Sequence, residues 1–119
     1  MRQVSLTKIF TFDAAHHLND YSGPCSRIHG HTYKLEVTVT GPLVSDMIVD
    51  FFDIKSLVED KVISLVDHSY LNEVVSFNPT VENMAVWIVK ILEPLFAGPV
   101  KLQKVRLWEN QSAYAEVIL

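Results

Sequence analysis

The chain has 119 residues, of which 49% are hydrophobic and 20% charged, which excludes a disordered protein and favours one folded domain over residues 1–119. A formal net charge of −4 disfavours a nucleic-acid-binding protein. One cysteine and the lack of a long apolar segment predict a reduced, cytoplasmic protein without membrane contact. The mean hydropathy of +0.19 is high for a small soluble protein and indicates apolar surface that contacts partner subunits.

The N-terminal third of the chain has the pattern of strands. Apolar residues alternate over residues 4–12 and 32–40, which predicts two strands with one buried face each. Gly41-Pro42 ends the second strand. A short apolar stretch at residues 47–49 is a further strand candidate.

The middle of the chain has helical spacing. Apolar residues recur at helical intervals over residues 54–65, with Asp53 as the expected N-cap. A second helix is predicted after Pro79, with Thr80 as its N-cap and an end at Gly98-Pro99.

Two strands, over residues 100–109 and 112–119, end the chain and are joined by a turn near Asn110-Gln111. Their alternation is imperfect, and the last strand is apolar on both faces. The order ββααββ predicts an α+β fold, with an antiparallel four-stranded sheet packed on two helices. The open edges of such a sheet and the surplus apolar surface predict assembly into a larger sheet or barrel.

Four of the five histidines lie between residues 16 and 31. His29 and His31 share a face of an extended segment at a spacing of about 6.6 Å, which suits two ligands of one metal ion. His16 and His17 end the preceding strand, which would pair with the strand that follows His31, so either can be the third ligand. Three neutral histidines leave one position of a tetrahedral zinc ion open, as in catalytic sites. The alternative is a set of unrelated surface histidines.

Three further positions have two or more interpretations. Cys25 is a buried apolar residue, a fourth zinc ligand, or a thiolate base near the metal. Asp67-His68 is an acid–base pair or the end of a helix. Glu109 has the parity of an inward-facing residue and would then need a ligand with guanidine-like donors; the alternative is a turn residue in water.

These residues fall into motifs that run through the chain. The motifs are Phe12-Asp13-Ala14-Ala15-His16, Cys25-x-x-x-His29-Gly30-His31, Asp67-His68-x-Tyr70-Leu71-Asn72, Asn78-Pro79-Thr80-x-Glu82-Asn83 and Trp108-Glu109. In this order they resemble the 6-pyruvoyltetrahydropterin synthase family over nearly the whole chain. The three residues between the cysteine and His-Gly-His are similar to the 6-carboxytetrahydropterin synthase branch, which serves queuosine biosynthesis.

The resemblance implies a tunnelling fold, in which subunits join their sheets into a barrel, usually a hexamer built as a dimer of trimers. It implies a zinc ion on His16, His29 and His31, and Cys25 as the proton-abstracting base. Asp67 and His68 would relay protons, and Glu109 would bind the guanidine edge of the pterin and join the relay. Thr80 would lie beside the pterin, from the same or a neighbouring subunit. Ser69 stands where some relatives carry a second histidine.

The implied substrate is 7,8-dihydroneopterin triphosphate, which a lyase of this branch converts to 6-carboxy-5,6,7,8-tetrahydropterin, acetaldehyde and triphosphate. Two alternatives remain open at this point: the sister elimination that makes 6-pyruvoyltetrahydropterin, and a non-catalytic zinc module. A triphosphate requires cations although the chain is acidic. The candidates are Arg27, Lys34, Lys101, Lys104 and Arg106.

Overall fold

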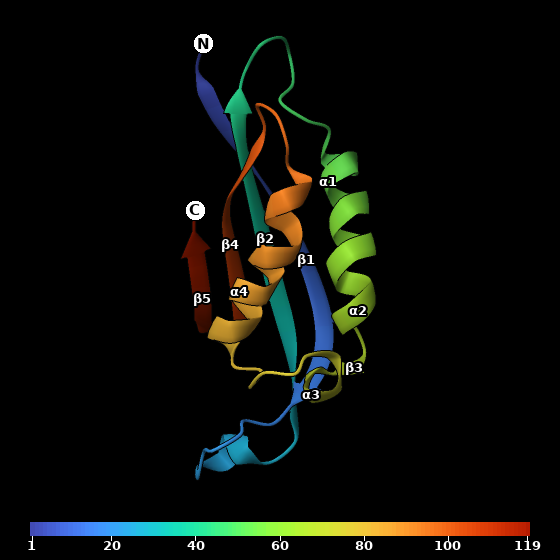
Figure 1. Ribbon diagram of the computed structural model, residues 1–119, viewed down its shortest axis with the longest axis vertical. Helices are drawn as coiled ribbons and strands as arrows, with labels where there is room; N and C mark the ends of the chain where they lie inside the picture. Colours follow the sequence, from blue (N-terminus) through green and yellow to red (C-terminus); the bar gives the residue numbers. More distant parts are fainter.

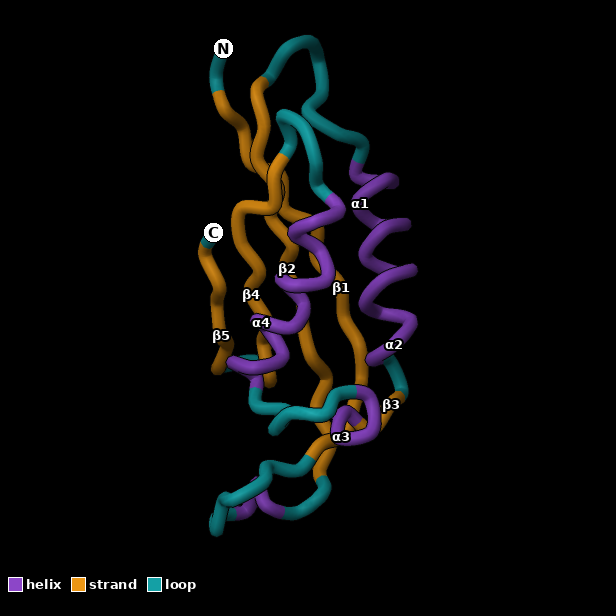
Figure 2. Tube along the Cα trace, viewed as in Figure 1, coloured by secondary structure: helices purple, strands orange, loops and turns teal.

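A computed structural model describes all residues, 1–119. Its centre is one sheet with the strand order β3-β1-β2-β4-β5 (Figures 1 and 2). The strands are β1 (Gln3–His16), β2 (His29–Pro42), β3 (Ser69–Tyr70), β4 (Lys101–Asn110) and β5 (Ala113–Ile118). All neighbours pair antiparallel except β3, which runs parallel to β1. The α+β prediction is confirmed, and the two-residue β3 is a fifth strand that the sequence pattern did not predict.

The helices cover one face of the sheet (Figure 1). A first helical stretch comprises α1 (Phe51–Val58), a π-helical segment (Glu59–Ile63) and α2 (Ser64–Val66). The others are α3 (Leu71–Val74) and α4 (Val81–Leu92), with short 3-10 turns at Pro24–Ser26 and Glu93–Leu95. No helix is long and apolar enough to span a membrane.

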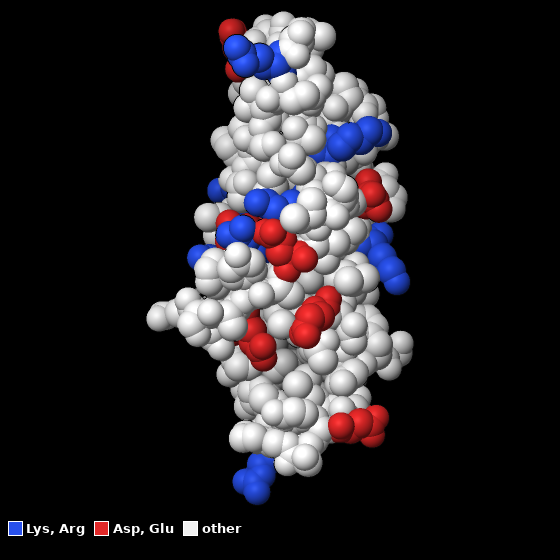
Figure 3. Space-filling view, turned by 90° about the vertical axis from the view of Figure 1, so that its left-hand side faces the viewer, with Lys and Arg blue, Asp and Glu red and all other residues white.

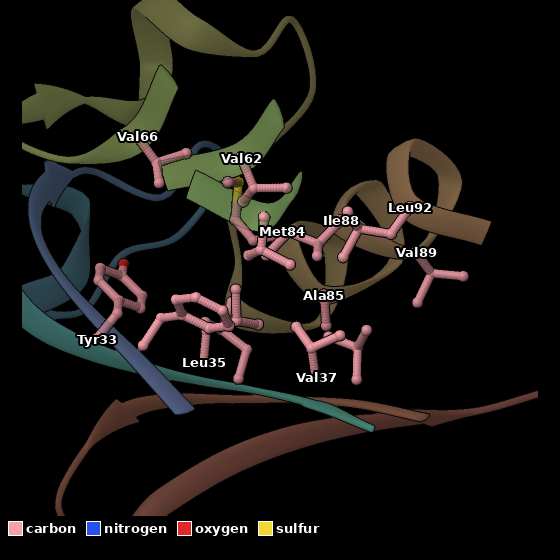
Figure 4. Close-up of a cluster of buried hydrophobic side chains, with 14 of the residues drawn as sticks. Tyr33, Leu35, Val37, Val62, Val66, Met84, Ala85, Ile88, Val89 and Leu92 are labelled. Carbon is pink, nitrogen blue, oxygen red and sulfur yellow. The ribbon is translucent and has the colours of Figure 1, made fainter. Parts of the chain in front are cut away.

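The core lies between the inner face of β2 and the helices. Tyr33, Leu35 and Val37 alternate with outward residues and point towards the layer of helices, where Met84 and Ile88 of α4 lie over Leu35 and Val37 (Figure 4). All five side chains are fully buried. The period-2 pattern of the strand and the 3.6-residue pattern of the helix therefore bury their apolar faces against each other.

The N-cap of the first helix and the segment before this helix differ from the prediction. The N-cap of α1 is Asp50, whose side chain accepts from the Phe52 N–H at 2.9 Å, while Asp53 lies in the first turn. The buried apolar residues of this helix begin after its first turn, because Phe51 and Phe52 are exposed. The apolar spacing in the sequence therefore placed the start of the helix too late. The strand candidate at residues 47–49 is also wrong, since this segment pairs with no strand. Thr80 caps α4 as predicted, accepting from the Asn83 N–H at 3.1 Å.

A bulge explains the imperfect alternation of β4. Lys104 pairs with Thr38 but Leu102 pairs with Val39, so Gln103 is an extra residue in the ladder. The extra residue turns both Leu102 and Val105 towards the core, although their numbers have opposite parity.

The molecule is elongated, with extents of 52 × 24 × 22 Å. Its radius of gyration is 15.3 Å, against about 13.5 Å for a compact domain of this length. The excess length comes from the β1–β2 hairpin, which extends beyond the helices to the loop at residues 17–28 (Figure 1). On the side that carries β5, basic and acidic side chains lie next to one another and form no extended patch of one charge (Figure 3).

Candidate functional site

Three histidines meet at the end of the β1–β2 hairpin and form what we call the histidine cluster: His16, His29 and His31. His16 is the last residue of β1 and pairs with His29, the first residue of β2. His31 follows two residues later and therefore points to the same face. The ring centroids lie 4.6, 4.8 and 5.2 Å apart. The predicted convergence of strand ends is thus what the structure contains.

Hydrogen bonds to carbonyl groups fix the orientation of two of the rings. His16 Nδ1 donates to the Pro79 carbonyl at 2.8 Å, and His29 Nδ1 donates to the Arg27 carbonyl at 2.7 Å. A carbonyl only accepts, so the proton of each neutral ring sits on Nδ1 and leaves Nε2 with a free lone pair. The two Nε2 atoms face each other at 3.0 Å. Two lone pairs at this distance need a cation between or beside them, and such carbonyl-held rings are typical of metal ligands.

The third ring is equally available for a metal. His31 Nε2 is buried and forms no hydrogen bond with a backbone group, and a Glu109 carboxylate oxygen lies 3.0 Å from it. Burial lowers the pKa of His31, and the neighbouring Glu109 carboxylate offsets this only in part, so the neutral ring is favoured. A buried ring nitrogen beside a carboxylate oxygen and two oriented lone pairs fits a bound cation. The donor set therefore suits zinc, which binds imidazole nitrogen readily.

Glu109 faces the histidine cluster, as its parity predicted. Its Oε1 lies 3.0 Å from His31 Nε2 and 3.4 Å from His16 Nε2. The four donor atoms lie within 4.8 Å of one another, and the sulfur of Cys25 is not in this group. The interpretation of Cys25 as the ligand that closes a three-histidine site is therefore not what the geometry favours.

Cys25 lies in the 3-10 turn of the loop at residues 17–28, which we call the Cys25 loop. Its side chain is partly buried, and its carbonyl accepts from the Leu18 N–H at 2.8 Å. This bond joins the two sides of the loop at the level of the cysteine.

Two asparagines hold the Cys25 loop to the body of the protein. Asn72 accepts from the His17 N–H at 2.9 Å and donates to the His17 carbonyl at 3.0 Å. Asn78 does the same to Asn19, at 2.9 and 3.3 Å. Each amide thus acts as one residue of a β-ladder, and together they fix the residues on either side of Leu18. Both asparagines belong to motifs in the sequence, but the sequence pattern alone did not predict this role for them.

Asp67 and His68 lie at the end of α2, beside the start of β3. Asp67 Oδ1 accepts from the Asp13 N–H at 3.0 Å and is 3.0 Å from His68 Nδ1. The Asp13 N–H lowers the pKa of Asp67, and the His68 side chain adds to this effect. The side chain of His68 is 79% exposed, on a backbone with φ of 58°. The pair therefore has the geometry of an oriented imidazole that faces outward.

An open hollow of about 420 Å³ connects this pair to the histidine cluster, because His31 and His68 both line it. Cys25 does not line it.

His17, Thr80 and Ser69 lie around this region without joining the cluster. His17 has the opposite parity to His16 and its Nδ1 bonds to the Tyr70 hydroxyl. Thr80 follows Pro79, whose carbonyl holds His16, so the α4 cap and the histidine orientation depend on the same turn. Ser69 donates to the Val66 carbonyl at 2.6 Å, a local role that leaves His68 unaffected.

Comparison with known proteins gives the family. The family described as 6-pyruvoyl tetrahydropterin synthase matches residues 5–118. The chain belongs to this family. The resemblance to this family that was drawn from the motifs is therefore confirmed.

Individual relatives have different activities. The dihydroneopterin monophosphate aldolase of Pyrococcus furiosus is 37% identical over 107 residues, which cover 90% of each chain. The 6-carboxy-5,6,7,8-tetrahydropterin synthase of Haemophilus influenzae is 29% identical, over 93% of this chain and 96% of that protein. The structure of 6-pyruvoyl tetrahydropterin synthase from Caenorhabditis elegans superposes with a TM-score of 0.88 at 27% identity, covering 100% of this chain and 97% of that one.

Proposed function

We propose that the protein is a zinc-dependent lyase that converts 7,8-dihydroneopterin triphosphate, with one water, to 6-carboxy-5,6,7,8-tetrahydropterin, acetaldehyde and triphosphate. The observation that carries the proposal is the convergence of the His16, His29 and His31 ring nitrogens, with Glu109 beside them, in one group of donor atoms that lie within 4.8 Å of one another. The Haemophilus influenzae relative supports the choice of reaction. In this role the protein would serve 7-deazaguanine and queuosine biosynthesis.

The proposed metal is zinc, held by His16, His29 and His31. When bound, zinc would lower the pKa of the substrate side-chain hydroxyls, as it does for bound water. The carbonyl groups of Pro79 and Arg27 keep both rings turned towards the ion.

Proton transfer is the task of the chain's own side chains. Cys25 as thiolate would remove the proton from the substrate side-chain carbon. Asp67 holds His68 by its Nδ1, which leaves Nε2 free to exchange protons with substrate or thiol. Glu109 would accept two hydrogen bonds from the amino-pyrimidine edge of the pterin, and Thr80 would lie beside the ring.

We propose that more than one subunit completes the site. Cys25 is not among the residues that line the hollow beside His68, and a neighbouring copy would supply the missing half of the relay. A homo-oligomer, most simply a hexamer of two trimers in the cytoplasm, would bring them together. Exposed Ile9, Phe52 and Ile118 supply apolar surface for such contacts.

A phosphate-bearing substrate needs cations, and the structure narrows the candidates. Lys104 and Arg106 pair with Glu116, and Lys34 lies over the Trp108 ring at 4.3 Å. Lys101 lies opposite Thr40 in the β2–β4 ladder, at the end of the sheet away from the histidines. Arg27 is the remaining candidate for a phosphate contact, because it is exposed in the Cys25 loop, two residues before His29.

The scarcity of cations favours a second candidate function, the retro-aldol cleavage of dihydroneopterin monophosphate. A monophosphate carries less charge than a triphosphate, and the Pyrococcus furiosus relative is named for that activity. The same base and metal site would break the side-chain carbon–carbon bond and release a phosphorylated two-carbon aldehyde.

Product analysis distinguishes these candidates. The zinc-loaded protein is incubated with dihydroneopterin triphosphate or with the monophosphate, and products are identified by mass and by aldehyde trapping. Acetaldehyde and 6-carboxytetrahydropterin from the triphosphate support the main proposal. 6-Pyruvoyltetrahydropterin indicates the sister elimination, cleavage of the monophosphate alone indicates the aldolase, and no turnover of either favours a non-catalytic zinc module.

A further inference from the structure

Glu109 occupies an irregular position in the sheet. Trp108 pairs with Tyr114 and Asn110 with Ala113, so Glu109 is an extra residue with no partner on β5. Such bulges are over-represented at sheet edges and next to active sites. The side chain keeps the inward direction that its parity predicts, faces the histidine cluster and is only 22% exposed.

The environment of Glu109 contains no permanent cation. Its ion-pair contacts are with His16 and His31 alone. Glu116, on the neighbouring strand, is also 22% exposed but pairs with Arg106 and Lys104. A largely buried carboxylate needs a positive partner, and no lysine or arginine pairs with Glu109.

The distances around Glu109 match those between ligands of one zinc ion. Zinc bonds of about 2.0–2.1 Å in a tetrahedral site place neighbouring donor atoms about 3.3–3.4 Å apart. His16 Nε2 lies 3.0 Å from His29 Nε2 and 3.4 Å from Glu109 Oε1. The separation of His31 Nε2 from the same oxygen is 3.0 Å. Small outward shifts would make room for one ion among all four atoms.

We propose that Glu109 Oε1 is the fourth metal ligand in the substrate-free enzyme, and that a substrate hydroxyl displaces it. The displaced carboxylate is then free to bind the amino-pyrimidine edge of the pterin. The inference rests on the proposed metal site at the histidine cluster. Glu109 would then link recognition of the pterin to the release of one coordination position on the metal. That position becomes free only when a ligand arrives that carries both a hydroxyl group and an amino-pyrimidine edge.

Cobalt(II) in place of zinc provides a test that does not depend on turnover. We expect Glu109→Gln to weaken binding of the metal about tenfold or more in competition with a chelator. The visible absorption of the cobalt-substituted variant should also shift from that of the cobalt-substituted wild-type protein, because one anionic oxygen leaves the coordination shell of the metal. Acetate added to Glu109→Ala should restore the wild-type spectrum. Glu116→Gln is the control, with equal burial but no contact with the histidines, and its spectrum should be unchanged.

Unchanged cobalt affinity and spectrum in Glu109→Gln, with a melting curve that shows a folded protein, would overturn the inference. If that variant keeps the wild-type spectrum while the wild-type enzyme releases acetaldehyde, the ligand assignment fails and the proposed function stands. If the spectrum shifts but no pterin is turned over, the ligand assignment stands and the proposed function fails.

Discussion

The hydrogen bonds from Asn72 and Asn78, which we call the asparagine clamps, lead to a specific prediction about the Cys25 loop. Asn72→Ala removes both hydrogen bonds to His17, and Asn78→Ala removes both bonds to Asn19. Each bond contributes about 0.5–1.5 kcal/mol, so either variant should destabilise the closed loop by about 1–3 kcal/mol. The fraction of open loop should then rise about 5- to 150-fold.

Trypsin can report this fraction, because Arg27 is exposed and lies in the Cys25 loop. When opening is fast relative to cleavage, the rate of cleavage after Arg27 follows the open population. We expect faster cleavage in both variants and faster alkylation of Cys25, with little change in the global unfolding midpoint.

Gln103→Ala serves as the control, since this side chain bonds only to the Ser5 hydroxyl. Cleavage of Asn72→Ala and Asn78→Ala at the wild-type rate would refute the idea that these amides hold the loop.

Three further predictions concern the catalytic groups and the assembly. Cys25→Ala should lose about 10²–10⁴-fold in rate while keeping its zinc; loss of zinc in proportion to activity would make the cysteine a ligand instead. Asp67→Asn should lower stability at about pH 6, because the folded-state pKa of Asp67 lies below its usual 3.8 and the ionised group is favoured in the fold. The difference from wild type in urea unfolding should shrink as the pH falls through that lowered pKa, and a difference independent of pH would contradict the assignment. Light scattering at micromolar concentration should show an oligomer, and a stable monomer would contradict the assembly proposal.

The fold and the histidine cluster follow from patterns that are local in the sequence. Alternation placed His29 and His31 on one face, and a hairpin between neighbouring strands was enough to bring His16 to them. The choice of His16 over His17 came from the resemblance to the family, and the structure adds its physical reason: His17 points to the other face and bonds to Tyr70.

Other features depend on contacts that a local pattern does not contain. The bulges at Gln103 and Glu109 arise from how β4 meets its neighbours, so parity counted along β4 could not locate them. The asparagine clamps join residues more than fifty positions apart. The early start of α1 was hidden because its first aromatic residues face solvent.

We propose that zinc bound at the histidine cluster drives cleavage of the pterin side chain. The most direct measurement is the release of acetaldehyde from dihydroneopterin triphosphate as zinc is titrated into chelator-treated enzyme. We expect activity that rises to a plateau at one zinc per chain, with the same plateau for His17→Ala and no activity for His29→Ala. Full activity of the metal-free protein, or of His29→Ala, would contradict it.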